Sequence, residues 1–272
     1  MKDFKENKNA EDLPDALEQI DEIFKKIGSK KPALFLDYDG TLTPIVSNPE
    51  NAILSDEAKE ALSKLSEDIK VAIISGRDRK DIKKRIDIEN LIYAGSHGFD
   101  IKGPNNINIQ YEPGKKALPQ LDEAENQIQD KLKDIKGAQV ERKKYAIAVH
   151  YRNVDESEID KVKDTINKEV KAYNKLKIGT GKMILELKPD LDWDKGRALE
   201  RLMEELKLSE AEHVPIFIGD DVTDEDALKA VRKSGVGIIV GSHDEKTAAS
   251  YRLEDSSAVM KFLDELLHRL KK

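Results

Sequence analysis

The sequence predicts an α/β protein with a doubly wound parallel sheet and a smaller inserted α+β domain. Short apolar runs such as residues 33–36, 71–74 and 215–218 lack polar alternation, which is typical of strands buried on both faces. Each run ends in a polar turn followed by a helix or loop, the order expected of Rossmann-like folds. Between residues 112 and 187 the pattern changes to charged helices and alternating strands. We therefore assign that segment to a separate domain.

The composition favours a protein that functions in water. The 272 residues suit one large or two smaller domains, and 38% are hydrophobic. A net charge of −7 argues against a general nucleic-acid binder. The absence of cysteine excludes disulfides, thiolate nucleophiles and cysteine-ligated zinc. Because no apolar run approaches about 18 residues and no signal-like start is visible, we expect a cytoplasmic monomer without membrane or nucleic-acid partners.

The first 29 residues are expected to add a helix that packs on the core. This helix should begin at Asp12-Leu13-Pro14, where Pro14 suits the first turn, and end at Gly28. The core itself is assigned to residues 30–111 and 188–272. Its other predicted elements are a helix capped by Ser55, a helix over 79–86, a strand over 91–94, helices from Asp194 and Asp224, a strand over 235–240 and a helix over 258–270.

The inserted domain is predicted to combine long helices with half-exposed strands. Helices are expected over about 117–133 and 156–172. Residues 139–151 alternate between apolar and charged side chains, which predicts one antiparallel strand. A strand or hairpin over 176–178 and 182–187 closes the domain. The chain is expected to return to the core at residues 188–190.

Chemically active side chains follow several of the predicted strands. Asp37 and Asp39 end the first buried strand, Ser75 ends the second, and Asp220 follows a later one. Lys195 opens a helix. Because the carboxyl ends of parallel strands face one ligand crevice, we expect these groups to converge there.

The chemistry of such a cluster is coherent. A carboxylate such as Asp37 can attack a phosphate ester and form an aspartyl phosphate. Asp39 can protonate the leaving alkoxide and later deprotonate the attacking water. Mg²⁺ held by Asp37, Asp220 and the Asp39 carbonyl would offset the phosphoryl charge. Ser75 would supply a hydroxyl donor, and Lys195 a positive charge.

Each feature also has a simpler structural explanation. Asp37 and Asp39 suit an Asx turn, Ser75 a helix N-cap, and Lys195 a solvated surface position. The acids at 220–221 and 224–226 suit a helix N-terminus. Their occurrence at successive element ends is not well explained in this way, so we favour a common site.

The motifs resemble those of the haloacid-dehalogenase superfamily of phosphatases. The matching segments are Asp37-Tyr38-Asp39-Gly40-Thr41, Ser75-Gly76-Arg77, Lys195 and Gly219-Asp220-Asp221-Val222-Thr223-Asp224-Glu225-Asp226. The resemblance implies an Mg²⁺ cofactor, with Asp37 as nucleophile and Asp39 as general acid and base. It adds Asp221 and Asp224 to the metal site and Thr41, Gly76 and Arg77 to the substrate contacts.

The position of the insertion narrows the resemblance. Residues 76–194 separate Ser75 from Lys195, far more than one strand–helix unit needs. A cap domain at this position is similar to that of sugar phosphatases, where cap closure excludes water. The residues of the cap domain then indicate the class of substrate. Charged residues at spacing two suit a polyhydroxylated ligand, although an exposed sheet with ordinary cross-strand ion pairs explains them equally well.

A closer similarity is to trehalose-6-phosphate phosphatases. It is carried by segments 140–143, 149–152, 181–189 and 95–98. The resemblance implies that the cap residues grip the two glucose rings and that His97 contacts the substrate. The implied cap residues are Glu141, Lys143, His150, Arg152, Lys182 and Glu186. Ser96 and Asp194 depart from the family pattern, which more often has Asn at the first position and Asn or a similar residue at the second.

The expected activity is therefore Mg²⁺-dependent hydrolysis of trehalose 6-phosphate to trehalose and phosphate. The same chemistry on sucrose 6-phosphate or mannosyl-3-phosphoglycerate is the near alternative. A receiver-type signalling module also uses an acceptor Asp, acidic metal ligands, a hydroxyl and a Lys. Such a module needs no inserted cap and gives no role to Asp39.

Overall fold

The computed structural model describes residues 7–46, 48–181 and 183–271. The chain divides into two compact units. Unit 1 comprises Met1–Ile109 and Trp193–Lys272, and unit 2 comprises Gln110–Asp192. The sequence-based boundaries lie at residues 112 and 187. The assignment of catalysis to one unit and of specificity to the other stays a prediction.

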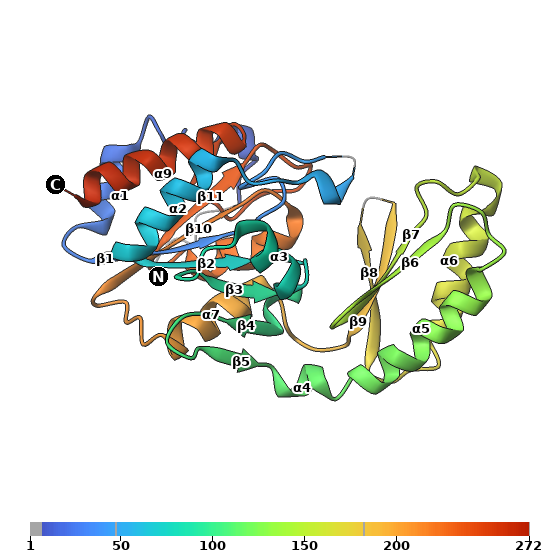
Figure 1. Cartoon of the computed structure of the whole chain (residues 1–272). Coiled ribbons are helices and arrows are strands. Elements are labelled where there is room, and N and C mark those ends of the chain that lie inside the picture. Colours follow the sequence, from blue (N-terminus) through green and yellow to red (C-terminus); the bar gives the residue numbers. More distant parts are fainter. Residues whose placement is uncertain (1–6, 47, 182, 272) are drawn as a thin grey trace. The chain divides into compact units, whose positions relative to one another are not determined.

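Within the described residues, unit 1 is built on an eight-stranded sheet with the strand order β12-β11-β10-β1-β2-β3-β4-β5 (Figure 1). The neighbours from β12 to β3 run parallel, and β4 is antiparallel to β3. The strands are β1 Lys31–Leu36, β2 Lys70–Ile74, β3 Ile92–Gly95, β4 Asp100–Lys102, β5 Asn108–Gln110, β10 His213–Gly219, β11 Val236–Val240 and β12 Tyr251–Leu253. The predicted doubly wound α/β fold is confirmed.

Helices cover both faces of this sheet. The α-helices of unit 1 are α1 Ile20–Ile27, α2 Asp56–Asp68, α3 Arg79–Ile86, α7 Lys195–Glu205, α8 Glu225–Val231 and α9 Ser256–Leu270. The short 3-10 helices are η1 Ala10–Asp12, η2 Pro49–Asn51, η3 Ser96–Gly98 and η4 Val222–Asp224. Leu34 and Leu36 of β1 pack with α1, α2, α3 and α9, whereas Phe35 packs with α7 and α8. Burial on both faces explains the continuous apolar run of β1.

The helix near the N-terminus begins later than predicted. It starts at Ile20, whereas Pro14 and Ala16 lie beside β12. The Pro14 carbonyl accepts a hydrogen bond from the Arg252 amide, and the Ala16 amide donates to the Arg252 carbonyl. These long-range bonds hold the segment outside a helix, so the predicted start at Asp12-Leu13-Pro14 is wrong.

Unit 2 is a four-stranded antiparallel sheet with helices packed on one face. Its strand order is β6-β7-β9-β8 in the described residues. The elements are α4 Glu112–Lys115, α5 Leu118–Leu132, β6 Gln139–Lys143, β7 Ala146–His150, α6 Glu156–Val170, β8 Leu176–Gly181 and β9 Ile184–Pro189. Apolar residues of α5 and α6 form one core with the odd-numbered residues Ile147, Val149, Leu185 and Leu187. The even-numbered residues of β7 and β9 therefore occupy the other face.

Residues 139–151 form a hairpin, so the prediction of one continuous strand is wrong. The turn lies at Lys144 and Tyr145, and Tyr145 is buried. Arg152 lies in a turn after β7 and does not extend the strand face of His150. Lys182 lies outside the described residues.

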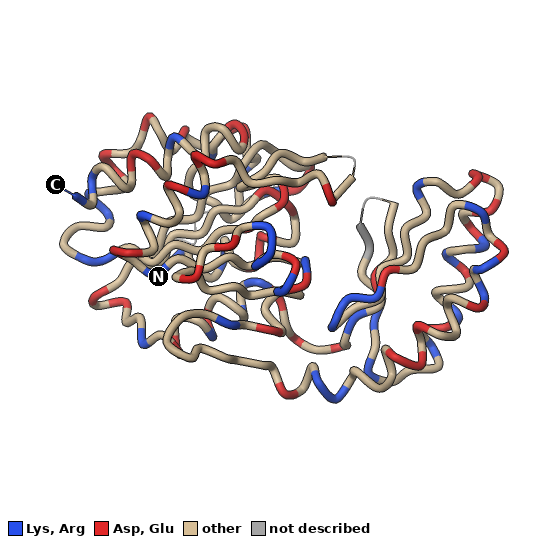
Figure 2. The backbone as a smooth tube through the Cα atoms, in the orientation of Figure 1, with Lys and Arg blue, Asp and Glu red and all other residues tan. Residues whose placement is uncertain are grey.

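Charged residues are distributed differently on the sheet and the helices. Figure 2 shows Lys and Arg interleaved with Asp and Glu along α5 and α6, whereas β10 and β11 carry neither. Mixed charges on the outer helix faces are typical of solvated surfaces. Charged side chains that are instead buried at strand ends need a separate explanation.

Candidate active site

Two neighbouring strands bring together acids that are far apart in the sequence. β1 and β10 are parallel partners, with Leu36 opposite Ile218. The Asp37 amide donates to the Ile218 carbonyl at 2.9 Å, which continues the strand pairing by one residue. Asp220 therefore follows β10 close to the point where Asp37 follows β1. The sheet edge positions both carboxylates before any ligand binds.

Three carboxylates and one ammonium form the centre of the site. Single oxygens of Asp37, Asp220 and Asp224 all lie within 4.8 Å of one another. The Lys195 Nζ donates to Asp37 Oδ1 at 2.7 Å and to Asp224 Oδ1 at 2.6 Å. Asp37, Lys195 and Asp224 are buried, with exposed fractions of 5%, 3% and 0%. Lys195 is therefore not the solvated residue of the simpler explanation.

Asp224 links the acidic cluster to the backbone. Its Oδ2 accepts hydrogen bonds from the amides of Asp220 at 3.2 Å and Asp221 at 3.1 Å. Gly219 permits this approach, because a Cβ there would lie 2.5 Å from Asp224 Cγ. The Asp221 carboxylate accepts from the Val222 amide at 2.7 Å and caps η4. In the described residues, the compact acidic group thus contains Asp224 and not the Asp221 side chain.

Gly40 packs tightly against the same cluster. It has a φ of +82°, and a Cβ there would lie 2.0 Å from Asp220 Oδ2. Both the backbone angle and the space therefore require glycine in the turn after Asp39. The adjacent Thr41 is fully buried, and its Oγ1 lies 3.5 Å from Asp220 Oδ1.

The electrostatics of the cluster favour a bound cation. Burial raises the pKa of Asp37 to about 7; Lys195 partly opposes this shift, and Asp224 adds to it. Burial, followed by the charges of Asp37 and Asp224, raises the pKa of Asp220 to about 8. Burial alone would lower the pKa of Lys195, but Asp224 and Asp37 outweigh it and raise that pKa. Three acids share one buried ammonium, so the ionised cluster carries more negative charge than Lys195 balances.

The donor set of this cluster fits a hard divalent cation. Carboxylate oxygens from Asp37, Asp220 and Asp224 are the ligands that Mg²⁺ prefers. Their spacing allows one ion to contact all three, and its charge would offset the crowding that raises the two carboxyl pKa values.

Asp39 points to a different partner. Arg77 donates from Nε to Asp39 Oδ2 and from Nη2 to Asp39 Oδ1, each at 2.6 Å. The arginine arises from the turn after β2, which also holds Ser75. Ser75 is buried, and its Oγ accepts from the Arg77 amide at 3.2 Å. Ser75 is not the helix N-cap of the simpler explanation, because Asp78 holds the N-cap position of α3. The local bond to the Arg77 amide leaves the Ser75 hydroxyl proton available to a ligand.

His97 lies against the Ser75 turn. A Cβ on Gly76 would lie 2.9 Å from His97 Cε1, so glycine permits this packing. The His97 amide donates to the Ser75 carbonyl at 2.8 Å, and the Trp193 Nε1 donates to the His97 carbonyl at 3.1 Å. Ser75, Gly76 and His97 are thus brought together.

The two departures from the family pattern have local structural roles. The Ser96 hydroxyl donates to Asp78 Oδ1 at 3.0 Å. The Asp194 carboxylate accepts from the Arg197 amide at 2.8 Å and caps α7, the helix that begins with Lys195. Asp194 therefore supports the helix that presents the buried lysine.

Four of the predicted cap residues form two contacts on the helix-free face of unit 2. His150 Nε2 lies 2.9 Å from Glu141 Oε2. The Lys143 Nζ donates to Glu186 Oε1 at 3.1 Å. The register places Ala148 between Glu141 and Glu186, so these side chains share one face. Arg152 lies beyond this strand face, in the turn.

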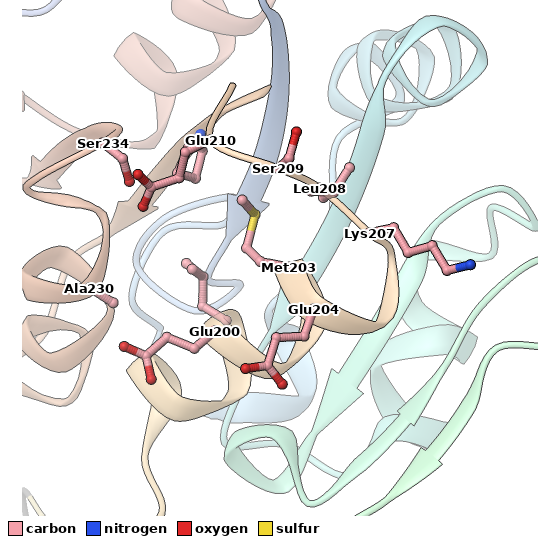
Figure 3. Close-up of a pocket in the computed structure, with 11 residues that line it drawn as sticks. Glu200, Met203, Glu204, Lys207, Leu208, Ser209, Glu210, Ala230 and Ser234 are labelled. Atoms are coloured by element: carbon pink, nitrogen blue, oxygen red, sulfur yellow. The ribbon is translucent and has the colours of Figure 1, made fainter. Parts of the chain in front are cut away.

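A groove of about 490 Å³ elsewhere on unit 1 lacks these chemical groups. It lies along the second half of α7 and the start of β10, whereas Asp220 follows the end of β10. Glu200, Glu204 and Glu210 border it around Met203 (Figure 3). The described lining contains none of the predicted site residues, so the acidic cluster is the better candidate active site.

The fold of this chain is shared with haloacid-dehalogenase-like hydrolases. A haloacid dehalogenase-like hydrolase from Bacteroides thetaiotaomicron matches 87% of this chain and all of its own, with a TM-score of 0.63 at 18% identity, which shows a common fold. The sequence profile of the trehalose-phosphatase family matches residues 35–257. The chain belongs to the trehalose-phosphatase family, and both predicted resemblances are confirmed.

Individual relatives agree with this assignment. A probable trehalose-phosphate phosphatase of Oryza sativa is 42% identical over 93% of this chain and 71% of its own length. The C-terminal domain of trehalose-6-phosphate phosphatase from C. albicans has a TM-score of 0.77 at 26% identity, over 94% of this chain and 99% of that one. No helix among the described residues is long and apolar enough to cross a membrane.

Proposed function

We propose that this protein hydrolyses trehalose 6-phosphate to trehalose and phosphate. The carrying observation is the buried cluster of Asp37, Asp220 and Asp224 with Lys195, found in a chain of the trehalose-phosphatase family. The names of the rice and C. albicans relatives support the substrate. The cluster supplies a nucleophile, a fixed positive charge and oxygen ligands in one place.

The proposed reaction has two steps at Asp37. In the first, an Asp37 oxygen bonds to phosphorus, the bond from phosphorus to the sugar oxygen breaks, and Asp39 gives that oxygen a proton. In the second, water bonds to phosphorus and loses a proton to Asp39, and the Asp37–phosphorus bond breaks. Lys195 keeps Asp37 oriented through its 2.7 Å hydrogen bond. Ser75 is assigned to hydrogen bonding with the phosphoryl group.

We assign Mg²⁺ to the acidic cluster, with Asp37 and Asp220 as ligands, the Asp39 carbonyl as a third, and Asp224 supporting them. When bound, the ion supplies charge that offsets repulsion between Asp37 and the phosphoryl oxygens. The contacts of the Asp221 side chain give it a capping role in η4, which weakens its assignment as a ligand.

The charged face of unit 2 is proposed to recognise the sugar. Glu141, Lys143, His150 and Glu186 offer donors and acceptors to hydroxyl groups. The contacts Glu141–His150 and Lys143–Glu186 bring these groups together on one face of the sheet. Arg152 and Lys182 are proposed as further contacts from the family resemblance alone.

Phosphate release from a panel of sugar phosphates tests this proposal. Trehalose 6-phosphate should be hydrolysed over many turnovers with Mg²⁺, and activity should be lost after chelation and return with added Mg²⁺. Much faster hydrolysis of sucrose 6-phosphate or mannosyl-3-phosphoglycerate would contradict the substrate. Uptake of one phosphoryl group without turnover would instead indicate a receiver-type module.

A further inference from the structure

A chain of alternating charges connects the Asp39 carboxylate to helix α3 and the 48–52 loop. We call it the ionic ladder, and its members are Asp39, Arg77, Asp81, Arg85 and Glu50. Every contact in it lies within unit 1. The ladder includes side chains that none of the four sequence motifs contains, namely those of Asp81, Arg85 and Glu50.

Arg77 is held on three sides. Two of its nitrogens bind both oxygens of Asp39, and Nη1 donates to Asp81 Oδ2 at 3.2 Å. Nη2 also donates to the Pro49 carbonyl at 2.8 Å. Its guanidinium carbon lies 5.6 Å from the centre of the Tyr38 ring, and 13% of the side chain is exposed. A two-pronged arginine–carboxylate pair of this kind fixes direction as well as distance.

Asp81 joins Arg77 to Arg85. The Arg85 Nε lies 2.9 Å from both oxygens of Asp81. Burial alone would raise the pKa of Asp81, yet hydrogen bonds from Arg85 and Arg77 lower it below its ordinary value. The carboxylate is therefore charged and is shared between two arginines four residues to either side.

Arg85 anchors the far end of the ladder. Its Nη1 donates to the Glu50 carbonyl at 3.1 Å, and its Nη2 donates to Glu50 Oε2 at 3.0 Å. Only 10% of its side chain is exposed, against 79% for Glu50. The ladder thus runs from a fixed helix and loop to the acid next to the proposed nucleophile.

We propose that Asp81 and Arg85 are positioning residues for proton transfer by Asp39. They hold Arg77, and Arg77 holds the carboxylate that the proposed function assigns as acid and base; the inference rests on that assignment. Arg77 then acts through Asp39, and its side chain does not serve mainly as a phosphate ligand. Misplacement of a catalytic group by about 1 Å costs up to about 100-fold in rate, so remote anchors matter.

The leaving group provides the test. A sugar alkoxide needs a proton as it departs, whereas p-nitrophenolate departs without one. In single-turnover experiments with excess enzyme and Mg²⁺, Asp81→Asn should slow sugar release from trehalose 6-phosphate by about tenfold or more. Release of p-nitrophenol from p-nitrophenyl phosphate should stay within about twofold of wild type, because that step needs no acid.

Matched variants separate positioning from general structural effects. Asp81→Glu keeps the charge and should restore part of the lost rate, whereas Arg85→Met should repeat the selective loss. Glu265→Gln removes an acid that pairs with Arg269 four residues later in α9, and it should change neither release rate. The exposed side-chain fractions of Asp81 and Glu265 match, at 36% and 37%.

Two results would overturn the proposal. If Asp81→Asn slows p-nitrophenol and sugar release equally, the ladder supports phosphate binding or the fold, and not proton transfer. If it slows neither, the ladder has no part in catalysis.

If the wild-type protein does not hydrolyse trehalose 6-phosphate, the proposed function fails separately from the ladder. Phosphate release after the p-nitrophenol step, which needs Asp39 as base, then tests the ladder, with slower release expected in Asp81→Asn.

Discussion

The charged residues of unit 1 and unit 2 are held in contrasting ways. In unit 1, Lys195 is 3% exposed and bonds to two carboxylates, and Asp224 also accepts two backbone amides. In unit 2, the side chains of the Glu141–His150 pair are 54% and 34% exposed. Buried charges with several partners are costly to displace, whereas exposed pairs exchange partners readily.

This difference separates two tasks. Chemistry at phosphorus benefits from groups that are fixed before the substrate arrives, because reorganisation then adds little to the barrier. Recognition of a sugar with many hydroxyls benefits from donors and acceptors that are near water and adjustable. The buried Lys195 cluster of unit 1 has the first property, and the exposed Glu141–His150 pair of unit 2 has the second. Variants in the two units should therefore fail in different ways.

The largest expected effect follows from Asp37→Asn. The neutral amide is a poor nucleophile and a weaker metal ligand, so turnover should fall by about 10⁴-fold or more on every substrate. Phosphate release from trehalose 6-phosphate and p-nitrophenyl phosphate measures the loss. Glu265→Gln is the control. A rate near wild type on either substrate would remove Asp37 from the mechanism.

Lys195→Met should reduce stability as well as activity. It leaves the Asp37 and Asp224 carboxylates buried without their ammonium, a change that costs about 3–5 kcal/mol for buried pairs. Chemical unfolding without divalent cations measures the loss. Lys229→Met removes a surface lysine paired with Asp226 at 3.3 Å and should cost less than about 1 kcal/mol. Equal losses of stability in both variants would mean that the buried Lys195 contributes no more than a surface lysine does.

Glu186→Ala should affect recognition and leave the chemistry intact. We expect kcat/KM for trehalose 6-phosphate to fall by about tenfold, the cost of one hydrogen bond to a charged group. Hydrolysis of p-nitrophenyl phosphate, which carries no sugar, should be unchanged. Glu158→Ala on α6 is the control, because the Glu158 side chain pairs with Lys161 on the exposed surface of that helix. An equal fall in kcat/KM for both substrates would mean that Glu186 does not recognise the sugar.

The pH dependence of stability tests the buried carboxylates of unit 1 directly. Folding raises the pKa of Asp37 to about 7 and of Asp220 to about 8, so the folded protein binds protons that the unfolded chain has released. Without divalent cations, stability should therefore fall as the pH rises from about 4 to 8. Thermal unfolding at several pH values measures this trend. Added Mg²⁺ should raise the Tm most at pH 8, and a cation-free Tm that rises over this range would contradict the shifts.

Much of the core was predictable because its signals are local. The α3 bounds agree with the predicted 79–86, and the Ser55 hydroxyl accepts from the Ala58 amide at 3.2 Å as the cap pattern requires. The meeting of Asp37 and Asp220 follows from the rule that parallel strands end at one edge. These inferences needed only strand order and periodicity.

Other features depend on contacts that no local pattern contains. The segment around Pro14 is held beside β12 by Arg252, which lies far away in the sequence. The hairpin turn at Lys144 and Tyr145 contains no glycine. Its tyrosine is an apolar residue that continues the alternating strand pattern, and it is buried in the structure. The ionic ladder had a visible signal, since Arg77, Asp81 and Arg85 are spaced by four, but side-chain direction decides which acid Arg77 binds.

The pairing of β1 with β10 has a consequence for synthesis of the chain. The ribosome makes Asp37 well before the strand partner of β1, which begins at residue 213. A nascent chain that stops earlier contains β1 without β10, and it contains Asp37 without Asp220 and Asp224. Truncated products therefore expose the apolar edge of β1. Synthesis of β10 and of the turn after it is what brings Asp220 and Asp224 beside Asp37.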